Sequence, residues 1–495
     1  MGEPPTTGCG KSTTSKQRDR APRPGRYSRA AEHHRIPTQT VEVTDEMQRI
    51  SLLTISLLFF VVAANGVAEE SSAQRGYRLL LEKPYVPAYF DQETFDDVWR
   101  TWPKPLRSRA EKASAAERRK MAFARYGLTL RPGDESGKPL QFVIDQHDNW
   151  VPNCFTCHGG MLLGRVIPGL PNSHYALQTL IQETRLTKIR LRKPLQPIDF
   201  GSLVMPLGGT VGTTNAVIFG VALARQRDKH LNLVPASSLP NYLHHDMDAP
   251  PWWHFRKKAR LYLDGFAVKD HRPLMQFALD HRNGPEKFRE WEDDFRHIHA
   301  YLMSLEPPRY AFEIDHALAR EGQTVFERVC AECHGTYGPG GSYPTRIVPI
   351  DEIGTDRARI DALTPKHRED YRENWFSHYG RDDVIVDPGG YVAPPLDGVW
   401  ASAPYLHNGS VPTLWHMLHP DDRPVVWKRK GEVYDRQRVG FEIEAFGEMP
   451  TVRSITERRH YFNTTAFSKS AAGHLFPEVL TEPEKIAALE YLKTL

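Results

Sequence analysis

The chain has 495 residues, with 64 lysines and arginines against 61 aspartates and glutamates. This length excludes a single small domain, and the near-neutral charge gives no reason to expect nucleic acid or an anionic membrane surface as a partner. Five cysteines occur, and four of them form two Cys-x-x-Cys pairs, each followed directly by a histidine. No cysteine pair is left over for a structural disulfide.

The N-terminal region contains an uninterrupted run of 15 apolar or small residues at 50–64. The run is shorter than the roughly 20 residues that cross a bilayer, and small residues follow it, which is the layout of a cleaved secretory signal. A membrane anchor is the alternative. We predict a signal peptide over 47–73, starting at Met47, and expect residues 1–46 to be untranslated or disordered. The exported protein is then periplasmic or secreted, with no stable membrane insertion.

The first helix signal lies ahead of the first cysteine pair. Ser114 and Glu117 have capping-box spacing, which predicts a helix to Tyr126 with Gly127 as its stop. The first Cys-x-x-Cys-His is expected in a loop after it. Residues 201–220 are rich in Gly, Thr and small apolar residues, which predicts irregular structure packed against a flat group.

Two more helices flank the middle of the chain. Apolar residues recur at helical spacing over 285–305, and Pro307 and Pro308 end that element. We predict a domain boundary there. Asp315 then has the position of an N-cap for a helix that runs into Cys330.

The last helix begins at a capping box formed by Thr481 and Glu484. It is expected to bury Ile486, Leu489 and Leu492. Its end, Tyr-Leu-Lys-Thr-Leu at 491–495, echoes Tyr-Leu-Met-Ser-Leu at 301–305. An internal duplication explains the echo, and two unrelated amphipathic helices are the alternative.

The two Cys-x-x-Cys-His motifs predict covalent haem attachment. Both thiols lie on one face of a helical turn, so they can reach one porphyrin edge, and the next residue presents its imidazole to the iron. A zinc site is disfavoured because 172 residues separate the pairs, against the usual spacing of about 15 to 20. A redox dithiol is disfavoured because neither pair is expected after a buried strand and two copies occur. We predict two covalently bound haem c groups, with attachment residues Cys154, Cys157, His158, Cys330, Cys333 and His334.

The sixth position of each iron decides what the haem does. An open face admits a small ligand, whereas His or Met there favours electron transfer. The candidates for the second haem are His407, Met449 and, preferred, His474. For the first haem Met205 is one candidate, and the alternative is an open apolar face lined by Trp252, Trp253 and Phe266. Ordinary core packing is the competing explanation for each of these side chains.

The segment 403–414, Ala-Pro-Tyr-Leu-His-Asn-Gly-Ser-Val-Pro-Thr-Leu, resembles a hallmark loop near the second haem of the di-haem cytochrome c peroxidase superfamily. His407 in this loop is therefore expected to contact the cofactor. The chain is most similar to the rubber oxygenase-like branch, and the similarity covers most of the chain from about Tyr77. The segments that carry this similarity are 123–127, 153–160, 212–215 and 251–258.

This resemblance implies a fold that is mainly α, with extended loops and little β-structure. Two cytochrome c-like haem domains are expected, over 74–308 and 309–495. The first haem would keep an open or oxygen-bearing face, and the second would be held by His334 and His474.

The resemblance also implies a tryptophan between the haems and a phenylalanine over the open site. We assign these to Trp253 and Phe266, and Trp252 fits almost as well. The chain is shorter between Cys330 and His474 than the rubber-cleaving members, so loops that shape their substrate channel are expected to be missing.

Three functions share the two haems: a peroxidase, an oxygenase acting on an apolar substrate, and an electron carrier. A peroxidase needs an acid–base group over the open iron, and an oxygenase needs an apolar pocket. We predict a redox enzyme of the di-haem peroxidase superfamily with Trp252, Trp253 and Phe266 as catalytic candidates. Its partners would be a redox protein or a small oxidant, either peroxide or dioxygen.

Overall fold

The structure is a computed structural model that describes residues 69–235 and 244–495. Residues 70–495 form one compact unit. Of the described residues, 42% are helical and 13% lie in strands or bridges. The structure is thus mixed, and the prediction of a mainly α fold with little β-structure understated the strands. Most of the predicted signal peptide, including the apolar run at 50–64, lies outside the described residues, as do residues 1–46.

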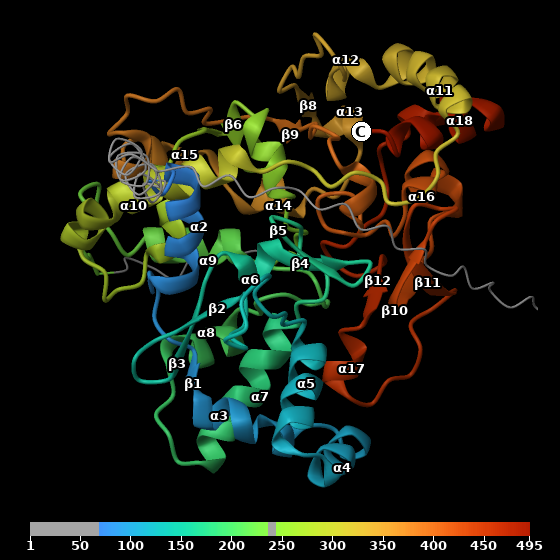
Figure 1. The fold of residues 1–495 in the computed structure, drawn as a ribbon. Coiled ribbons are helices and arrows are strands. Elements are labelled where there is room, and N and C mark those ends of the chain that lie inside the picture. The colour runs from blue at the N-terminus through green and yellow to red at the C-terminus, as the bar shows by residue number, and fades with distance from the viewer. Residues whose placement is uncertain (1–68, 236–243) are drawn as a thin grey trace, which may run out of the picture. The chain divides into compact units, whose positions relative to one another are not determined.

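The helices are short except for a few that flank the two cysteine motifs (Figure 1). The α-helices of the first half are α2 (Ser72–Glu82), α3 (Gln92–Asp97), α4 (Lys104–Lys112), α5 (Ala115–Tyr126), α6 (Phe155–His158), α7 (Leu177–Arg190), α8 (Pro197–Val204), α9 (Ala216–Ala224) and α10 (Pro285–Ser304). Those of the second half are α11 (His316–Val329), α12 (Ala331–His334), α13 (Ile350–Ile353), α14 (Ala358–Ala362), α15 (Pro365–Arg372), α16 (Leu414–Leu418), α17 (Ile455–Arg458) and α18 (Glu482–Leu492). The 3-10 helices are η1 (Val98–Thr101), η2 (Trp252–Arg256), η3 (Arg272–Ala278), η4 (Trp375–Ser377), η5 (Val399–Ala401), η6 (Pro420–Asp422) and η7 (Phe476–Val479).

The strands form small antiparallel sheets. Two have three strands each, in the orders β1-β3-β2 and β11-β10-β12, and the pairs β4-β5, β6-β7 and β8-β9 complete the set in the described chain. The bounds are β1 (Phe90–Asp91), β2 (Phe142–Ile144), β3 (Asn149–Pro152), β4 (Gly159–Leu162), β5 (Arg165–Pro168), β6 (Arg260–Leu261), β7 (Ala267–Val268), β8 (Ile347–Pro349), β9 (Gly390–Val392), β10 (Val426–Asp435), β11 (Gly440–Phe446) and β12 (Tyr461–Asn463).

Four predicted helices are confirmed because strong local signals define their ends. Ser114 caps α5 through a capping box with Glu117, and Gly127 stops it with a φ of 68°. Helix α10 ends at Ser304 ahead of the two prolines, and α11 starts where Asp315 accepts from the backbone of its first turn. Helix α18 starts at the predicted Thr481 capping box.

Two local predictions were wrong. Residues 201–220 were predicted to be irregular, but they contain the end of α8 and half of α9 on either side of an irregular loop. The prediction failed because it averaged the composition over both short helices and the loop. Ile486 is 48% exposed, since α18 packs through Ala487 and its neighbours instead. Ser71 caps α2, so the end of the predicted signal peptide at 71–73 overlaps the start of the first helix of the described chain, and the bounds of the signal stay a prediction.

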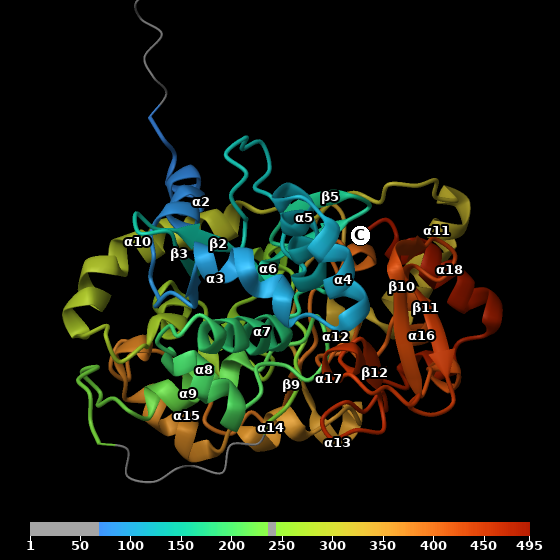
Figure 2. The same ribbon diagram turned by 90° about the horizontal axis from the view of Figure 1, so that it is seen from below.

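Each half contains a pair of crossed helices, α2 with α10 and α11 with α18, which lie side by side in Figures 1 and 2. A glycine sits at each crossing. A Cβ on Gly76 would lie 2.1 Å from the carbonyl oxygen of His297, and a Cβ on Gly322 would lie 1.9 Å from that of Ala487. His297 and Ala487 each precede by four residues the tyrosine of the echoed Tyr-Leu segment. The crossings therefore occur at equivalent positions, which supports the duplication.

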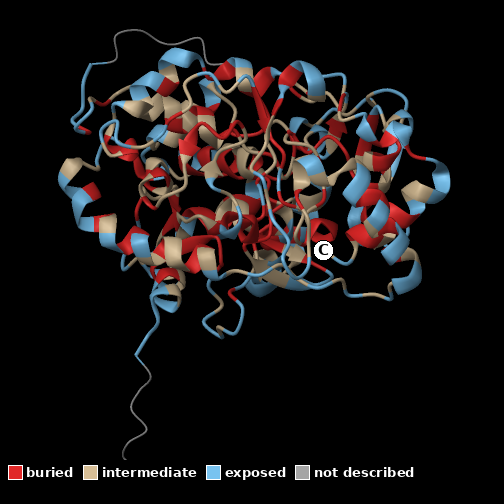
Figure 3. Ribbon diagram, turned by 90° about the horizontal axis from the view of Figure 1, so that it is seen from above, coloured by how far each residue is buried: buried red, intermediate tan, exposed pale blue. Residues whose placement is uncertain are grey.

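The hydrophobic core crosses the predicted boundary at residue 308. Leu162, Leu170 and Trp253 share one cluster with Phe326 and Tyr491 of the second half. Figure 3 shows buried residues gathered in the interior and exposed residues along the outer helices and loops. The halves thus pack on each other, and their assignment as two haem domains stays a prediction.

No helix in residues 69–235 or 244–495 has both the length and the apolar character needed to cross a membrane.

Candidate haem sites

The first motif lies on the single turn α6, held between β3 and β4 by an asparagine. The Asn153 side chain accepts a hydrogen bond from the Phe155 amide (2.9 Å) and donates to the carbonyls of Leu80 (3.0 Å) and Leu140 (2.9 Å). Contrary to prediction, a strand precedes this cysteine pair, because β3 ends at Pro152. Asn153 thus fixes the start of the turn that carries both thiols and the imidazole.

His158 packs face to face against Trp252, with ring centres 4.7 Å apart and an angle of 24° between the planes. Burial lowers the pKa of His158 to about 3, and the Pro250 carbonyl opposes this shift. The imidazole is therefore neutral at physiological pH, as an iron ligand must be.

One thiol of each motif, Cys154 or Cys330, packs against a hydrophobic cluster. Burial raises the pKa of Cys154 and of Cys330 to about 12, so both remain protonated. Reactive redox cysteines have a lowered pKa, which is opposite to the shift at these two thiols. In the described chain no group of three or more His, Cys, Asp or Glu side chains is arranged to hold a metal ion.

The second motif follows α11 directly, with Cys330 as the C-cap of that helix and His334 at the end of α12. His334 Nδ1 lies 2.8 Å from the Pro394 carbonyl oxygen. A carbonyl can only accept, so Nδ1 carries the proton and Nε2 keeps its lone pair. That tautomer is the one in which Nε2 can bind iron, and the Pro394 contact orients the ring.

His474 faces His334 across the second site, with ring centres 6.2 Å apart. Two metal–nitrogen bonds of about 2 Å, with about 1 Å from each nitrogen to its ring centre, would separate two imidazoles bound to one metal by about 6 Å. Burial lowers the pKa of His474 to about 3, so this ring is also neutral. The donor set of the second site therefore fits an iron held between two histidines.

Several contacts hold His474 in place, although it lies in a loop. Its amide donates to the Ile353 carbonyl (2.7 Å), and its φ of 52° is left-handed. Gly473 packs so closely on Gly354 that a Cβ would lie 2.3 Å from the Gly354 carbonyl carbon. Arg423 donates to the carbonyl of Gly473 (2.7 Å). Together these contacts hold His474 in its strained left-handed conformation.

The first site lacks this feature. Within the described residues, the ring contact of His158 is with Trp252, and no second imidazole faces it. Met205 caps the end of α8, and no recorded contact brings it to His158. The two motifs therefore share attachment chemistry and differ in what lies opposite the iron-binding histidine.

Trp253 contacts the segment that follows Pro394. Its indole Nε1 donates to the Asp397 carbonyl (2.6 Å), and His254 Nε2 lies 3.0 Å from the same oxygen. Asp397 follows Pro394 by three residues. Trp252 packs on His158, and its neighbour Trp253 bonds to the segment whose Pro394 carbonyl orients His334. These contacts form a continuous path between the two motif histidines.

The remaining candidates lie apart from the two motif histidines. Phe266 stacks on Tyr262 (4.6 Å, 10°) and meets the edge of Tyr371 (5.0 Å). His407 contacts Tyr391 (4.8 Å), and burial lowers its pKa to about 3. The catalytic roles of Trp252, Trp253 and Phe266 and the cofactor contact of His407 stay predictions.

Sequence reasoning missed the backbone groups that orient the histidines. The Pro394 carbonyl accepts from His334 and the Asp397 carbonyl accepts from Trp253, whereas His158 Nδ1 has no hydrogen-bond partner. These contacts join residues 60 to 144 positions apart in the chain. A repeated proline shortly ahead of a Trp or Asp was the one available signal, and it is weak.

Comparison with known proteins agrees with the haem interpretation. Residues 390–428, which include Pro394, Asp397 and His407, match the family described as RoxA-like, cytochrome c-like. The chain is 35% identical over 169 residues to the uncharacterized protein y4iM of Sinorhizobium fredii (strain NBRC 101917 / NGR234), covering 29% of this chain and 38% of that protein. It is 26% identical over 260 residues to the uncharacterized protein y4iJ of the same organism, covering 39% and 42%.

The chain thus spans about two fifths of the length of these curated relatives. The family match supports a relationship to rubber oxygenase-like cytochromes c, and a cytochrome c-like domain implies covalently bound haem c.

Proposed function

We propose that this chain is an exported di-haem c-type cytochrome and an oxidoreductase of the rubber oxygenase-like kind. The first haem is the reactive centre, where dioxygen meets an apolar substrate. The second haem relays electrons. The difference between the two motif histidines carries the proposal: His334 has His474 opposite it, and His158 has no imidazole partner in the described chain.

The number of haems is supported by the repeated architecture. Each Cys-x-x-Cys-His is accompanied by a crossed helix pair with a glycine at the crossing, Gly76 in one half and Gly322 in the other. Each motif histidine also lies near a proline carbonyl, that of Pro250 or that of Pro394. Because the two repeats share these features, we assign one haem to each repeat.

A bound haem supplies an iron that takes up a small ligand where one axial position is free and exchanges single electrons where both are filled. The protein's part is to set those positions. Pro394 fixes the His334 tautomer, and the Ile353 carbonyl holds His474 opposite it. Trp252 packs against His158 and limits rotation of that ring.

Trp253 and Asp397 provide a packed, hydrogen-bonded contact between the two sites. We expect this contact to support electron exchange between the haems.

The decisive experiment is electron paramagnetic resonance of the oxidised, haem-loaded protein, followed by titration with cyanide. We expect one low-spin signal from the His334/His474 site and one high-spin signal that cyanide converts to low-spin. Two low-spin signals unmoved by cyanide would make the chain an electron carrier.

The substrate is tested separately with oxygen-electrode measurements on a polyisoprene emulsion and on short isoprenoid oligomers. Oxygen uptake with formation of carbonyl-containing fragments is the expected result. If the chain instead consumes hydrogen peroxide with a reduced donor and leaves isoprenoids intact, it is a peroxidase.

A further inference from the structure

A compact cluster of charged side chains lies in the interior, away from the cysteines. Asp264, Arg359 and Arg368 are each at most 2% exposed. Arg368 donates to Asp264 Oδ2 from Nη2 (2.7 Å) and Nε (3.2 Å), and Arg359 Nη2 lies 3.4 Å from Oδ1. One carboxylate therefore serves two buried guanidinium groups.

The cluster carries excess positive charge. Lys258 also interacts electrostatically with Asp264, and burial lowers its pKa to about 8, so it is still mainly charged at neutral pH. Three cations against one carboxylate leave an excess of two positive charges. Among the described residues, no carboxylate other than Asp264 lies within ion-pair distance of Arg359 or Arg368. Lys258 is partly exposed, whereas the two guanidinium groups are buried with one carboxylate between them. Uncompensated buried charge is costly, so the two arginines need a further anion.

Arg359 also has unused hydrogen-bond donors. Its Nε and Nη1 atoms are buried and have no hydrogen-bond partner. In a planar guanidinium the fork that matches one carboxylate is formed by Nε with Nη2 or by Nη1 with Nη2, so the two unused donors point to opposite edges. Buried donors without partners are rare in native proteins, and two separate carboxylates at Arg359 would satisfy both atoms.

The segment that carries Arg359 is linked to the two segments that position His334 and His474. The Tyr391 hydroxyl accepts from the Ile360 amide (3.1 Å) and donates to the Asp356 carbonyl (2.9 Å), which ties the Arg359 segment to β9. Three residues beyond Tyr391, Pro394 orients His334. Six residues before Arg359, Ile353 holds His474 through its carbonyl. Both segments that position the facing histidines thus converge on Arg359.

We propose that Arg359, together with Arg368 and Lys258, binds the propionate carboxylates of the haem attached at Cys330 and Cys333. The inference rests on the proposed second haem. A haem has two propionates with one negative charge each, which matches the excess of two positive charges. The arginines then stabilise the reduced form of this haem, because reduction adds a negative charge beside them.

The test compares reduction potentials of the haem-loaded protein in optical and paramagnetic redox titrations, which separate a low-spin from a high-spin haem. In Arg359→Gln we expect the low-spin haem to become harder to reduce, with about a tenfold shift of its one-electron equilibrium, or about 59 mV. Arg359→Lys keeps the charge and should restore most of the potential. Lys258→Gln, at a partly accessible position, should shift the potential in the same direction and covers the case that Arg359→Gln fails to fold.

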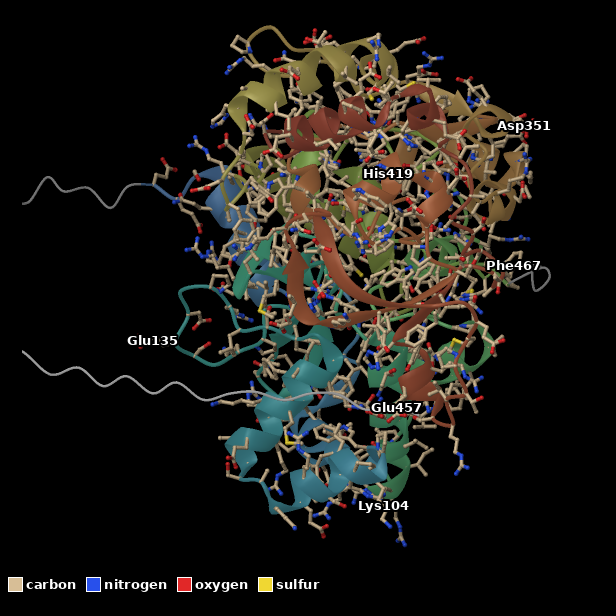
Figure 4. The ribbon with its side chains drawn as sticks, turned by 90° about the vertical axis from the view of Figure 1, so that its right-hand side faces the viewer. Lys104, Glu135, Asp351, His419, Glu457 and Phe467 are labelled. Carbon is tan, nitrogen blue, oxygen red and sulfur yellow. The ribbon has the colours of Figure 1, made fainter. Side chains whose placement is uncertain are left out.

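The matched control is Arg357→Gln. Arg357 belongs to the same segment but is 53% exposed and pairs with Asp351, which lies at the periphery of the molecule in Figure 4. Deleting this solvent-screened charge should leave both potentials unchanged.

The outcomes separate this inference from the proposed function. Two haems per chain with an unshifted low-spin potential in Arg359→Gln and Lys258→Gln would overturn the propionate site alone. A shift confined to the high-spin haem would assign the cluster to the first haem and also overturn it. A single haem, absent from Cys330 and Cys333, would overturn the proposed function itself.

Discussion

The two Cys-x-x-Cys-His sites share the arrangement of the motif itself and differ in the side chain that contacts the motif histidine. In both, a short helical turn presents the thiols and the histidine, and a glycine lets two helices cross nearby. At the second site a strained loop brings His474 to face His334, whereas at the first site Trp252 stacks on His158. Under the proposed function, haem attachment belongs to the repeated unit, and reactivity is set by loops that the two halves do not share.

The largest expected effect tests whether both units hold a haem. Replacing Cys154 and Cys157 by alanine should remove one covalent haem and leave the other, and replacing Cys330 and Cys333 should do the converse. Thioethers cannot form without the thiols. Intact mass and the haem-to-protein ratio measure this. A ratio of one haem per wild-type chain would show that only one of the two motifs binds haem.

The next effect tests the feature that separates the sites. His474→Ala should convert the low-spin haem to a high-spin form, because the facing imidazole is lost, and added imidazole should restore the low-spin signal. His407→Ala is the matched control, since His407 contacts Tyr391 instead of facing His334. A low-spin haem that survives in His474→Ala but not in His407→Ala would show that His407, and not His474, is the second histidine of this haem.

A third effect concerns the shared helix crossings. Gly76→Ala and Gly322→Ala should each destabilise the protein by about 1 to 3 kcal/mol, because the new Cβ would overlap a carbonyl oxygen of the opposing helix. Denaturant unfolding followed by tryptophan fluorescence gives the free energy. Gly447→Ala is the control, since a Cβ there meets nothing within 4 Å and the φ lies outside the left-handed range. A neutral outcome at either crossing would weaken the case for a duplicated unit.

The smallest effect is at the contact between the sites. Trp253→Phe removes the indole donor to the Asp397 carbonyl but keeps an aromatic ring, so stability should fall by about 1 kcal/mol. Electron exchange between the haems should slow, as measured by rapid mixing of the reduced protein with an oxidant. Unchanged exchange with the expected loss of stability would leave Trp253 a packing residue only.

Local signals made several elements predictable. Capping boxes and a stop glycine depend on neighbours in the chain, so α5 and α18 could be placed from sequence. The long hairpin of β10 and β11 was missed, because three consecutive charged residues at 428–430 interrupt the alternation expected of a strand. Ile486 was misplaced because the close approach of Gly322 and Ala487 turned the helix relative to the simple periodicity.

The sequence by itself determined the chemistry of attachment, since two thiols and an imidazole at fixed spacing are a local property of one helical turn. It also pointed to His474, through resemblance. Only the tertiary structure decided how His334 is oriented by Pro394, how Trp253 meets Asp397, and how Arg359 and Arg368 share Asp264. These contacts join residues 60 to 144 positions apart, and most use backbone carbonyls or buried charges, which no local pattern of side chains encodes.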